Sequence, residues 1–337
     1  MGGSATGGNA TAVGASSTAA GSGSTAYGLP ANAAGGSSLA IGPATAVDTD
    51  SFAIGNAASA QPAGTAVGSS AHASGDVSAA YGTNALASGA QAVGIGYNGN
   101  ATGAQSVAVG YKSTASNTAD SAFGNAANAS GGNSTALGSG AISSGSNSFA
   151  GGNAANASGT GSVAVGSTAI ANNTGAIAVG NAANASGNLA VGIGSSANAS
   201  GNESVGVGVQ SIAGSFAVGV GAGANASGGG AVGVGYLTNV APAIYGTDAP
   251  NWGQVQGLVR QADRGIAMTM AMAAQITPSA PGKTTLSLGV GAFAGEVGTS
   301  LNVVYRAPVS FPLFISGGVA ASDDGNWGGR VGIGIEF

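Results

Sequence analysis

Short apolar runs that each end in glycine recur along the first 236 residues. These glycines stand at positions 14, 28, 42, 55, 68, 82, 96, 110, 124, 138, 152, 166, 180, 194, 208, 221 and 235, and thirteen of the sixteen intervals are 14 residues long. A fixed period of this kind predicts a solenoid, in which each repeat is one coil that buries its apolar side against its neighbours. The letters NAANASG occur three times, at 125, 153 and 181, two coils apart.

Apolar and small residues alternate on both sides of each repeated glycine. The residue before it is Val, Ile, Leu, Phe or Tyr in sixteen of seventeen coils, and the third and fifth residues after it are mostly Ala. Alternation over such short runs is typical of strands, and the turns between them favour Gly and Asn. Two strands per coil are therefore expected. The residues predicted to line the coil core are Val109, Phe123, Val165, Val179 and Ile193.

The predicted solenoid is a thin rod. Coils stacked at roughly 4.8 Å give a rod of about 80 Å for seventeen coils. An interior lined by Ala on one side buries little apolar area. We therefore expect several rods to associate.

The period ends after residue 236, and three further segments are predicted. Residues 237–253, with Pro242 and Pro250, form a neck, and apolar residues at helical spacing predict a helix over 254–276. The unbroken apolar part of this helix is too short to cross a bilayer. Residues 277–337 contain four alternating segments with one apolar face, which is typical of outer-membrane strands.

Four strands are too few to close a barrel around anything, because small barrels need eight or more. Three chains would supply twelve strands, enough to admit three helices. Gly289, Gly291 and Gly332 are then predicted to face the lumen and leave room for the helices, and Arg330 is predicted to face it as well.

Composition excludes several classes of function. Residues 1–250 hold one base, Lys112, against six acids, so nucleic-acid binding is not expected. The absence of cysteine and the single His72 exclude disulfides, cysteine-ligated zinc and multi-histidine sites. The string GIGYNG at 94–99 lacks the long strand and helix of a dinucleotide site. We predict neither enzyme activity nor a cofactor or metal.

The coils, the segment after them and the chain end together resemble one known family. SVAVG at 106–110 and 162–166, TDAPNWGQVQGL at 247–258 and four strands ending in Phe337 resemble the trimeric autotransporter adhesins, the YadA-like family. The resemblance covers essentially the whole chain. Asp248, Asn251 and Trp252 fall in its neck. It implies a mainly all-β fold, with a left-handed parallel β-roll head on a twelve-stranded outer-membrane barrel through which the helices of a homotrimer pass.

The resemblance also implies a function and partners. The anchor would contact outer-membrane lipid, be assembled by the barrel assembly machinery with Phe337 as its signal, and enable export of its own head, which is type V secretion. The head would bind host cells or extracellular matrix such as collagen. The start MGGSATGG has no charged and apolar regions of a secretory signal, so no signal peptide is expected in this chain.

One alternative remains open, a self-associating surface or biofilm protein without a specific host ligand. An ice-binding rod would require a strict Thr-x-Thr ladder, and a solenoid polysaccharide lyase would require clustered acids and bases. The sequence contains neither pattern.

Overall fold

The computed structural model describes residues 2–235, 243–244 and 250–336, and the chain divides into two compact units at residue 237. The first unit is a parallel β-solenoid, and the second contains one helix and four antiparallel strands. This confirms the predicted fold class. The neck residue Asp248 and the terminal Phe337 lie outside the described residues.

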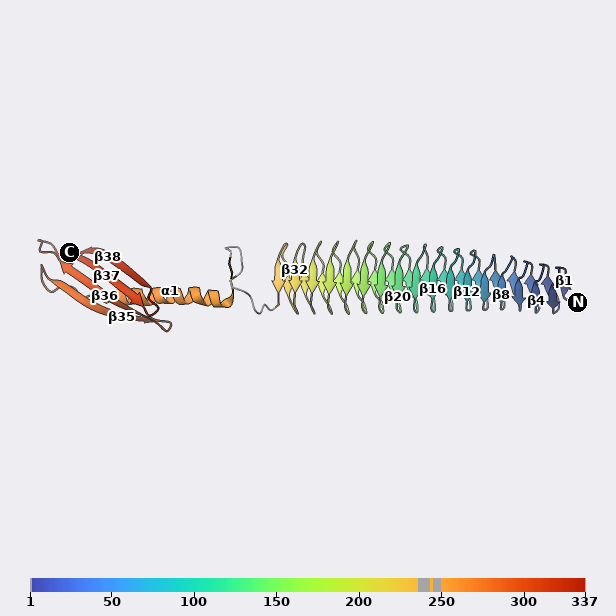
Figure 1. The fold of residues 1–337 in the computed structure, drawn as a ribbon, viewed down its shortest axis with the longest axis horizontal. Coiled ribbons are helices and arrows are strands. Elements are labelled where there is room, and N and C mark those ends of the chain that lie inside the picture. Colours follow the sequence, from blue (N-terminus) through green and yellow to red (C-terminus); the bar gives the residue numbers. More distant parts are fainter. Residues whose placement is uncertain (1, 236–242, 245–249, 337) are drawn as a thin grey trace. The chain divides into compact units, whose positions relative to one another are not determined.

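One sheet of the solenoid consists of three-residue strands, each paired in parallel with the next in the series (Figure 1). Their bounds are β2 Thr11–Val13, β4 Thr25–Tyr27, β6 Leu39–Ile41, β8 Phe52–Ile54, β10 Thr65–Val67, β12 Ala79–Tyr81, β14 Val93–Ile95, β16 Val107–Val109, β18 Ser121–Phe123, β20 Thr135–Leu137, β22 Phe149–Gly151, β24 Val163–Val165, β26 Ile177–Val179, β28 Val191–Ile193, β30 Val205–Val207, β32 Val218–Val220 and β34 Val232–Val234. The register advances by one coil per strand.

The other sheet consists of two-residue strands that are paired in the same way. Their bounds are β1 Ser4–Ala5, β3 Thr18–Ala19, β5 Asn32–Ala33, β7 Thr45–Ala46, β9 Ser59–Ala60, β11 His72–Ala73, β13 Leu86–Ala87, β15 Asn100–Ala101, β17 Thr114–Ala115, β19 Asn128–Ala129, β21 Ile142–Ser143, β23 Asn156–Ala157, β25 Ile170–Ala171, β27 Asn184–Ala185, β29 Asn198–Ala199, β31 Ile212–Ala213 and β33 Asn225–Ala226.

The space between the two sheets is filled almost wholly by alanine and serine. The middle residue of a three-residue strand, such as Ala108, and the second residue of a two-residue strand, such as Ala115, are fully buried. Ser106, which precedes β16, is buried as well. Alanine columns from the two sheets meet directly, so the interior has no room for larger side chains.

The apolar residues predicted to line the coil core lie on its outside. Because side chains alternate across a strand, burial of the middle alanine turns both flanking residues outward. Phe123 is 38% exposed and Ile193 is 40% exposed. Within one chain the core prediction is therefore wrong for all five residues: Val109, Phe123, Val165, Val179 and Ile193.

Two columns of glycine allow the coils to stack closely. Gly110 has a φ of 139°, which side chains disfavour, and a Cβ there would overlap the carbonyl oxygen of Gly124 in the next coil. Gly131 is the last residue of the first NAANASG, and its φ is not in the positive range that disfavours side chains. A Cβ on Gly131 would nevertheless overlap the carbonyl oxygen of Gly145. Close stacking alone thus requires the glycine that ends this repeated phrase.

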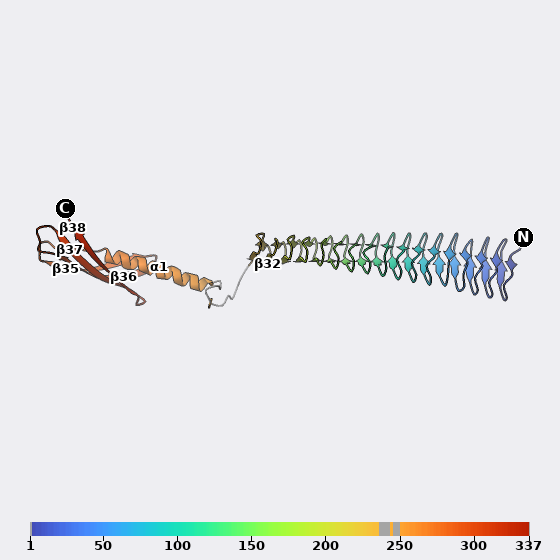
Figure 2. The same ribbon diagram turned by 90° about the horizontal axis from the view of Figure 1, so that it is seen from above.

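The second unit is one helix, α1 (Trp252–Met272), and an antiparallel sheet in chain order (Figure 2). Its strands are β35 Thr284–Phe293, β36 Glu296–Arg306, β37 Leu313–Ser322 and β38 Trp327–Ile335. Asn251 begins the helix with a capping box, because its side chain accepts from Gln254 N at 2.9 Å while Gln254 Oε1 accepts from Asn251 N at 3.1 Å.

The helix ends at Met272, four residues before the predicted end. Strand side chains donate to carbonyls at this end of the helix and just beyond it. Ser300 Oγ donates to Ala271 O at 2.8 Å, and Ser287 Oγ donates to Ala274 O at 3.0 Å. Ala271 O also accepts from Ala274 N at 3.2 Å, and the sheet satisfies Ala274 O beyond the last helical turn.

Candidate binding surfaces of the head and the C-terminal unit

The two-residue strands present an uncharged polar surface along the outside of the head, here called the polar face. It consists of the first residue of each strand and the residue after the strand, because the residue between them is buried. From β15 to β33 these pairs are Asn100 with Thr102, Thr114 with Ser116, Asn128 with Ser130, Ile142 with Ser144, Asn156 with Ser158, Ile170 with Asn172, Asn184 with Ser186, Asn198 with Ser200, Ile212 with Gly214 and Asn225 with Ser227.

Asparagines of the polar face turn their amide oxygens inward. The Oδ1 atoms of Asn100, Asn128 and Asn156 are shielded from solvent and accept no hydrogen bond. The Nδ2 group of each of these amides carries two donors. The polar face is thus uncharged from β15 to β33, where amide and hydroxyl side chains are interrupted by Ile142, Ile170 and Ile212.

The three-residue strands present an apolar surface on the opposite side of the coils, here called the apolar face. It consists of the first and third residues of β2 to β34. Exposed side chains in its third-residue column include Tyr27, at 57%, and Leu137, at 49%. A monomer rarely leaves so long an apolar surface in water, so this surface requires a covering partner.

One position of the apolar face lacks a side chain. Gly151 is the only glycine in the third-residue column, and the ring of Phe149 lies beside it. A Cβ on Gly151 would lie 2.8 Å from Phe149 Cε1. The phenyl ring occupies the space that a larger residue fills in the other coils.

A turn of the head carries two stacked tyrosines. The ring centroids of Tyr97 and Tyr111 are 5.4 Å apart with planes at 10°, and Lys112 Nζ lies 5.2 Å from the Tyr111 centroid. Both tyrosines directly follow a repeated glycine, one coil apart. The spacing of the two tyrosines is therefore already visible in the sequence.

Asp120 is fully buried where neighbouring coils have a serine, as at Ser106 and Ser134. Its carboxylate accepts from Asn117 N at 2.8 Å, Gly132 N at 2.9 Å, Ser134 N at 3.0 Å and Ser134 Oγ at 2.7 Å. These four bonds compensate the burial of a charge, so Asp120 links two successive coils.

His72 lies exposed on β11, with Nδ1 3.0 Å from Ser70 O. Throughout the described ranges, no group of three or more His, Asp or Glu side chains lies close enough to hold a metal ion. No helix in the described part of the chain is long and apolar enough to cross a membrane.

In the C-terminal unit, glycines of β35 and β36 pack directly against α1. A Cβ on Gly289 would overlap Ala271 O, and a Cβ on Gly291 would overlap Ala267 O. Gly298, which the sequence analysis missed, faces the helix in the same way at Met268. The lumen positions of Arg330 and Gly332, both on β38, stay predictions.

An ion cluster joins α1 to the turns of the sheet. Arg264 Nε lies 2.8 Å from Glu296 Oε2 and 3.6 Å from Asp323 Oδ1, and Arg264 Nη1 lies 2.5 Å from Asp324 Oδ2. Ser322 Oγ donates to Asp324 Oδ1 at 2.5 Å, and this bond holds the pKa of Asp324 below its ordinary value. Asp324 is 60 residues from Arg264 in sequence, so no local pattern predicted the pair.

The other end of α1 leaves apolar side chains in solvent. Trp252 is 73% exposed, Leu258 is 65% exposed and Val259 is 55% exposed. Trp252 and Val259 border a surface hollow of about 490 Å³ together with Val255. This part of the helix, like the apolar face, has the character of a surface that a partner covers.

Comparison with known proteins matches both units. The YadA head domain repeat matches residues 5–29, 62–85, 87–113, 115–141, 129–155, 143–169, 157–183 and 185–211, and the YadA-like membrane anchor domain matches residues 276–337. These matches cover more than half of the chain. The chain belongs to the YadA-like trimeric autotransporter adhesins. As a YadA-like adhesin it has an outer-membrane anchor and a head exposed at the cell surface.

Among solved structures, this YadA-like chain is similar to the collagen-binding domain of the Yersinia adhesin YadA. The sequence identity is 20%, the match covers 65% of this chain and 85% of that chain, and the TM-score is 0.18. No curated protein matches the chain.

Proposed function

We propose that the head of this YadA-like adhesin binds host extracellular matrix such as collagen through the polar face. The supporting observation is the row of uncharged donors in which Asn128, Asn156 and Asn184 recur every second coil. The face has no charge with which to attract a polyanion. Recognition must therefore come from hydrogen bonds, from apolar contact with residues such as Ile142, and from a regular shape.

Collagen offers the acceptors that such a face requires. Its chains adopt a polyproline-II-like conformation, in which backbone carbonyls are not used up by bonds within one chain. The amide Nδ2 groups of Asn128, Asn156 and Asn184, and the hydroxyl groups of the serines two residues after them, are donors that can bond carbonyl oxygens. Each contact is weak alone, but many coils on three heads raise the overall affinity through multivalency.

The C-terminal unit is proposed to assemble with two further copies into a twelve-stranded barrel that enables export of the head. Four strands cannot close alone, and Gly289 and Gly291 make room for a helix on the inner side. Phe337 stays the predicted signal for the barrel assembly machinery. We expect the full chain in outer membranes to run as a trimer that resists SDS until heated, whereas a monomer on unheated gels would contradict the barrel.

The matrix-binding proposal is tested with cells that display the full chain. The variant Asn128→Ala/Asn156→Ala/Asn184→Ala removes three amide side chains from the polar face. Its matched control, Asn125→Ala/Asn153→Ala/Asn181→Ala, removes the other asparagine of each NAANASG, which lies in a turn. We expect loss of binding to immobilised collagen in the first variant and near wild-type binding in the second, at equal surface display.

The self-association alternative predicts different results from the same cells. If neither variant changes binding and a panel of collagen, fibronectin and laminin retains no cells, the head has no matrix ligand of this class. Autoagglutination that persists in both variants would then favour a structural surface protein.

A further inference from the structure

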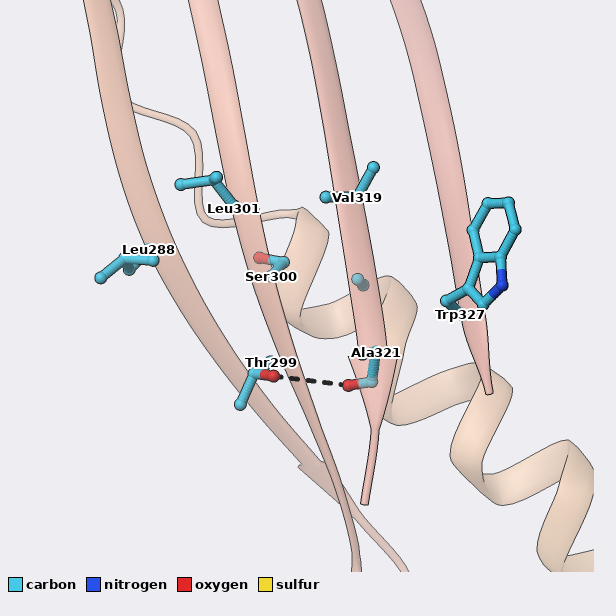
Figure 3. A pocket seen from close by; sticks show the side chains of 8 residues that line it. Leu288, Thr299, Ser300, Leu301, Val319, Ala321 and Trp327 are labelled. Carbon is cyan, nitrogen blue, oxygen red and sulfur yellow. Dashed lines mark hydrogen bonds between the residues drawn. The ribbon is translucent and has the colours of Figure 1, made fainter. Parts of the chain in front are cut away.

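The outer side of the four-stranded sheet contains a shallow apolar groove that needs no ligand of its own. The groove is bordered by Leu288, Leu301, Val319 and Trp327, each from a different strand (Figure 3). These are outward positions of the anchor strands, which in an outer-membrane barrel face hydrocarbon. The groove is therefore part of the membrane-facing surface.

The stacked pair of Tyr97 and Tyr111 in the head is an exposed aromatic surface of a different kind. The two residues are 46% and 47% exposed. Backbone hydrogen bonds fix the turns that carry them, because Asn98 N donates to Thr83 O at 3.0 Å and Lys112 N donates to Tyr97 O at 2.8 Å. The stack is therefore a rigid aromatic platform, which a ligand can bind without first ordering it.

One ring face of this platform is open. Tyr97 covers one face of Tyr111, so Lys112 Nζ lies over the other. The second face of Tyr97 is directed toward the preceding coil. There the residue after the repeated glycine is Thr83, which is too small to cover a phenol ring. The platform thus presents one free aromatic face, on Tyr97.

The side chains beside the free face are polar and uncharged. Thr83 and Asn84 of the preceding coil are exposed, and Asn98 follows Tyr97 in the same turn. A hydroxyl group and an amide group can each donate and accept hydrogen bonds. Sugar hydroxyl groups require partners of both kinds. An aromatic face bordered by such groups has the chemistry of a carbohydrate site.

Two other classes of ligand do not fit the platform. A nucleobase would bring phosphates with it, and Lys112 is the only base in residues 1–250. A proline-rich peptide docks in a groove between aromatic side chains. The centroids of the two rings are only 5.4 Å apart, so there is no groove between them.

We propose that the free face of Tyr97 binds one pyranose ring of a host glycan. The axial C–H groups of such a ring carry a partial positive charge and pack against the negative face of the phenol. Its equatorial hydroxyl groups reach Thr83 and Asn84, while Tyr111 supports Tyr97 from behind. The site does not use the asparagines of the polar face, so the inference goes beyond collagen binding.

The test uses cells that display the full chain and fluorescent polymers that carry β-galactoside or β-glucoside groups. Tyr97→Thr places at this position the residue of the preceding coil and removes the free face. Three heads bind one polymer together, so a small loss at each site multiplies, and we expect Tyr97→Thr cells to retain about tenfold less polymer than wild-type cells. Tyr97→Phe keeps the ring and should retain nearly as much polymer as wild type.

Two controls separate stacking on the ring from nonspecific adsorption. Leu29 is 60% exposed and directly follows a repeated glycine, as Tyr97 does. Leu29→Thr therefore removes an exposed apolar side chain from the same column and should leave binding unchanged. The same polymer carrying open-chain glucitol has hydroxyl groups but no ring face, and the cells should not retain it.

Lys112→Gln distinguishes a ring site from an anion site. Lys112 lies over Tyr111, away from the free face, so we expect this variant to bind the neutral polymers as wild type does. Loss of binding in Lys112→Gln, together with stronger retention of a sialylated polymer, would mean that the site pairs with an anion. That result would overturn the proposal.

Two further results would overturn it. One is equal polymer binding by Tyr97→Thr and Leu29→Thr at equal surface display, and the other is retention of neither neutral polymer by wild-type cells. Collagen binding is measured on the same cells and should persist in Tyr97→Thr. Failure of the glycan site is therefore distinguishable from failure of the polar face.

Discussion

Asp120 gives the sharpest test of how the head is held together. Replacing it by alanine removes the acceptor for Asn117 N, Gly132 N, Ser134 N and Ser134 Oγ, while the Ser134 hydroxyl keeps a bond to Ser143 O at 3.1 Å. Three backbone donors thus lose their partner, and only Ser134 N is fully buried. An unpaired buried donor costs about 1–3 kcal/mol, so we expect Asp120→Ala to lower the free energy of unfolding by about 2–4 kcal/mol.

The matched variant is Asp120→Ser, which places in this coil the residue of its neighbours. In an equivalent coil Gly131 N donates to Ser134 Oγ at 3.1 Å, so a serine at 120 can retain the bond from Asn117 N. Asp120→Ser should lose less than half as much stability as Asp120→Ala. Thermal unfolding followed by far-ultraviolet circular dichroism should show a drop of roughly 4–16 °C for Asp120→Ala, at about 2–4 °C per kcal/mol.

A wild-type melting temperature in Asp120→Ala would refute this reasoning. It would mean that the free energy of desolvating the Asp120 carboxylate equals the free energy gained from its four hydrogen bonds, as happens in some buried ion pairs. Hydrogen exchange at the Ser134 amide provides an independent measurement. The loss of its acceptor should raise the exchange rate of this amide more than the exchange rates of amides in distant coils.

Three further predictions concern the anchor and the apolar face. Gly291→Val should abolish the SDS-resistant trimer on unheated gels, because its side chain would overlap the helix, whereas Ala292→Val on the outward side should preserve it. In the head alone, residues 2–235, Val165→Asp on the apolar face should dissociate the heads, because burying an unpaired carboxylate costs several kcal/mol. Light scattering should then show a smaller particle, and an unchanged mass would contradict the interface. The pKa of Asp324 is lowered in the folded protein, so its stabilisation is present above about pH 3.8 and is lost as pH falls through the folded value. At pH values below about 4, the wild-type trimer should therefore become less resistant to heat, and the Asp324→Asn trimer should lose less of its heat resistance. Equal acid sensitivity of the two trimers would exclude a role for this carboxyl.

The period and the strands of the head were predictable from sequence because they are local. A repeated glycine and alternation on either side of it define each coil without knowledge of distant contacts. The direction of the side chains was not predictable from alternation, which separates two faces without saying which one is inside. Volume would have decided it, since Ala108 and Ala115 fit between sheets that Val109 and Phe123 could not enter.

The candidate surfaces were predictable to different degrees. The spacing of Asn128, Asn156 and Asn184 places them in one column as soon as the coil is known. The cluster around Arg264 depends on strand turns that are far away in sequence, so it could be found only after the sheet and helix were assembled. The groove beside Trp327 likewise results from the register of all four strands.

Phe149 and Gly151 have a consequence for how three heads would align. Along most of the apolar face one coil resembles the next, so a trimer displaced by a whole coil would lose little contact. At Gly151 the surface differs, because a ring lies where other coils carry a branched side chain or another ring. A displaced assembly would set each Phe149 ring against a different coil of the neighbouring heads, so we expect this single irregularity to disfavour displacement.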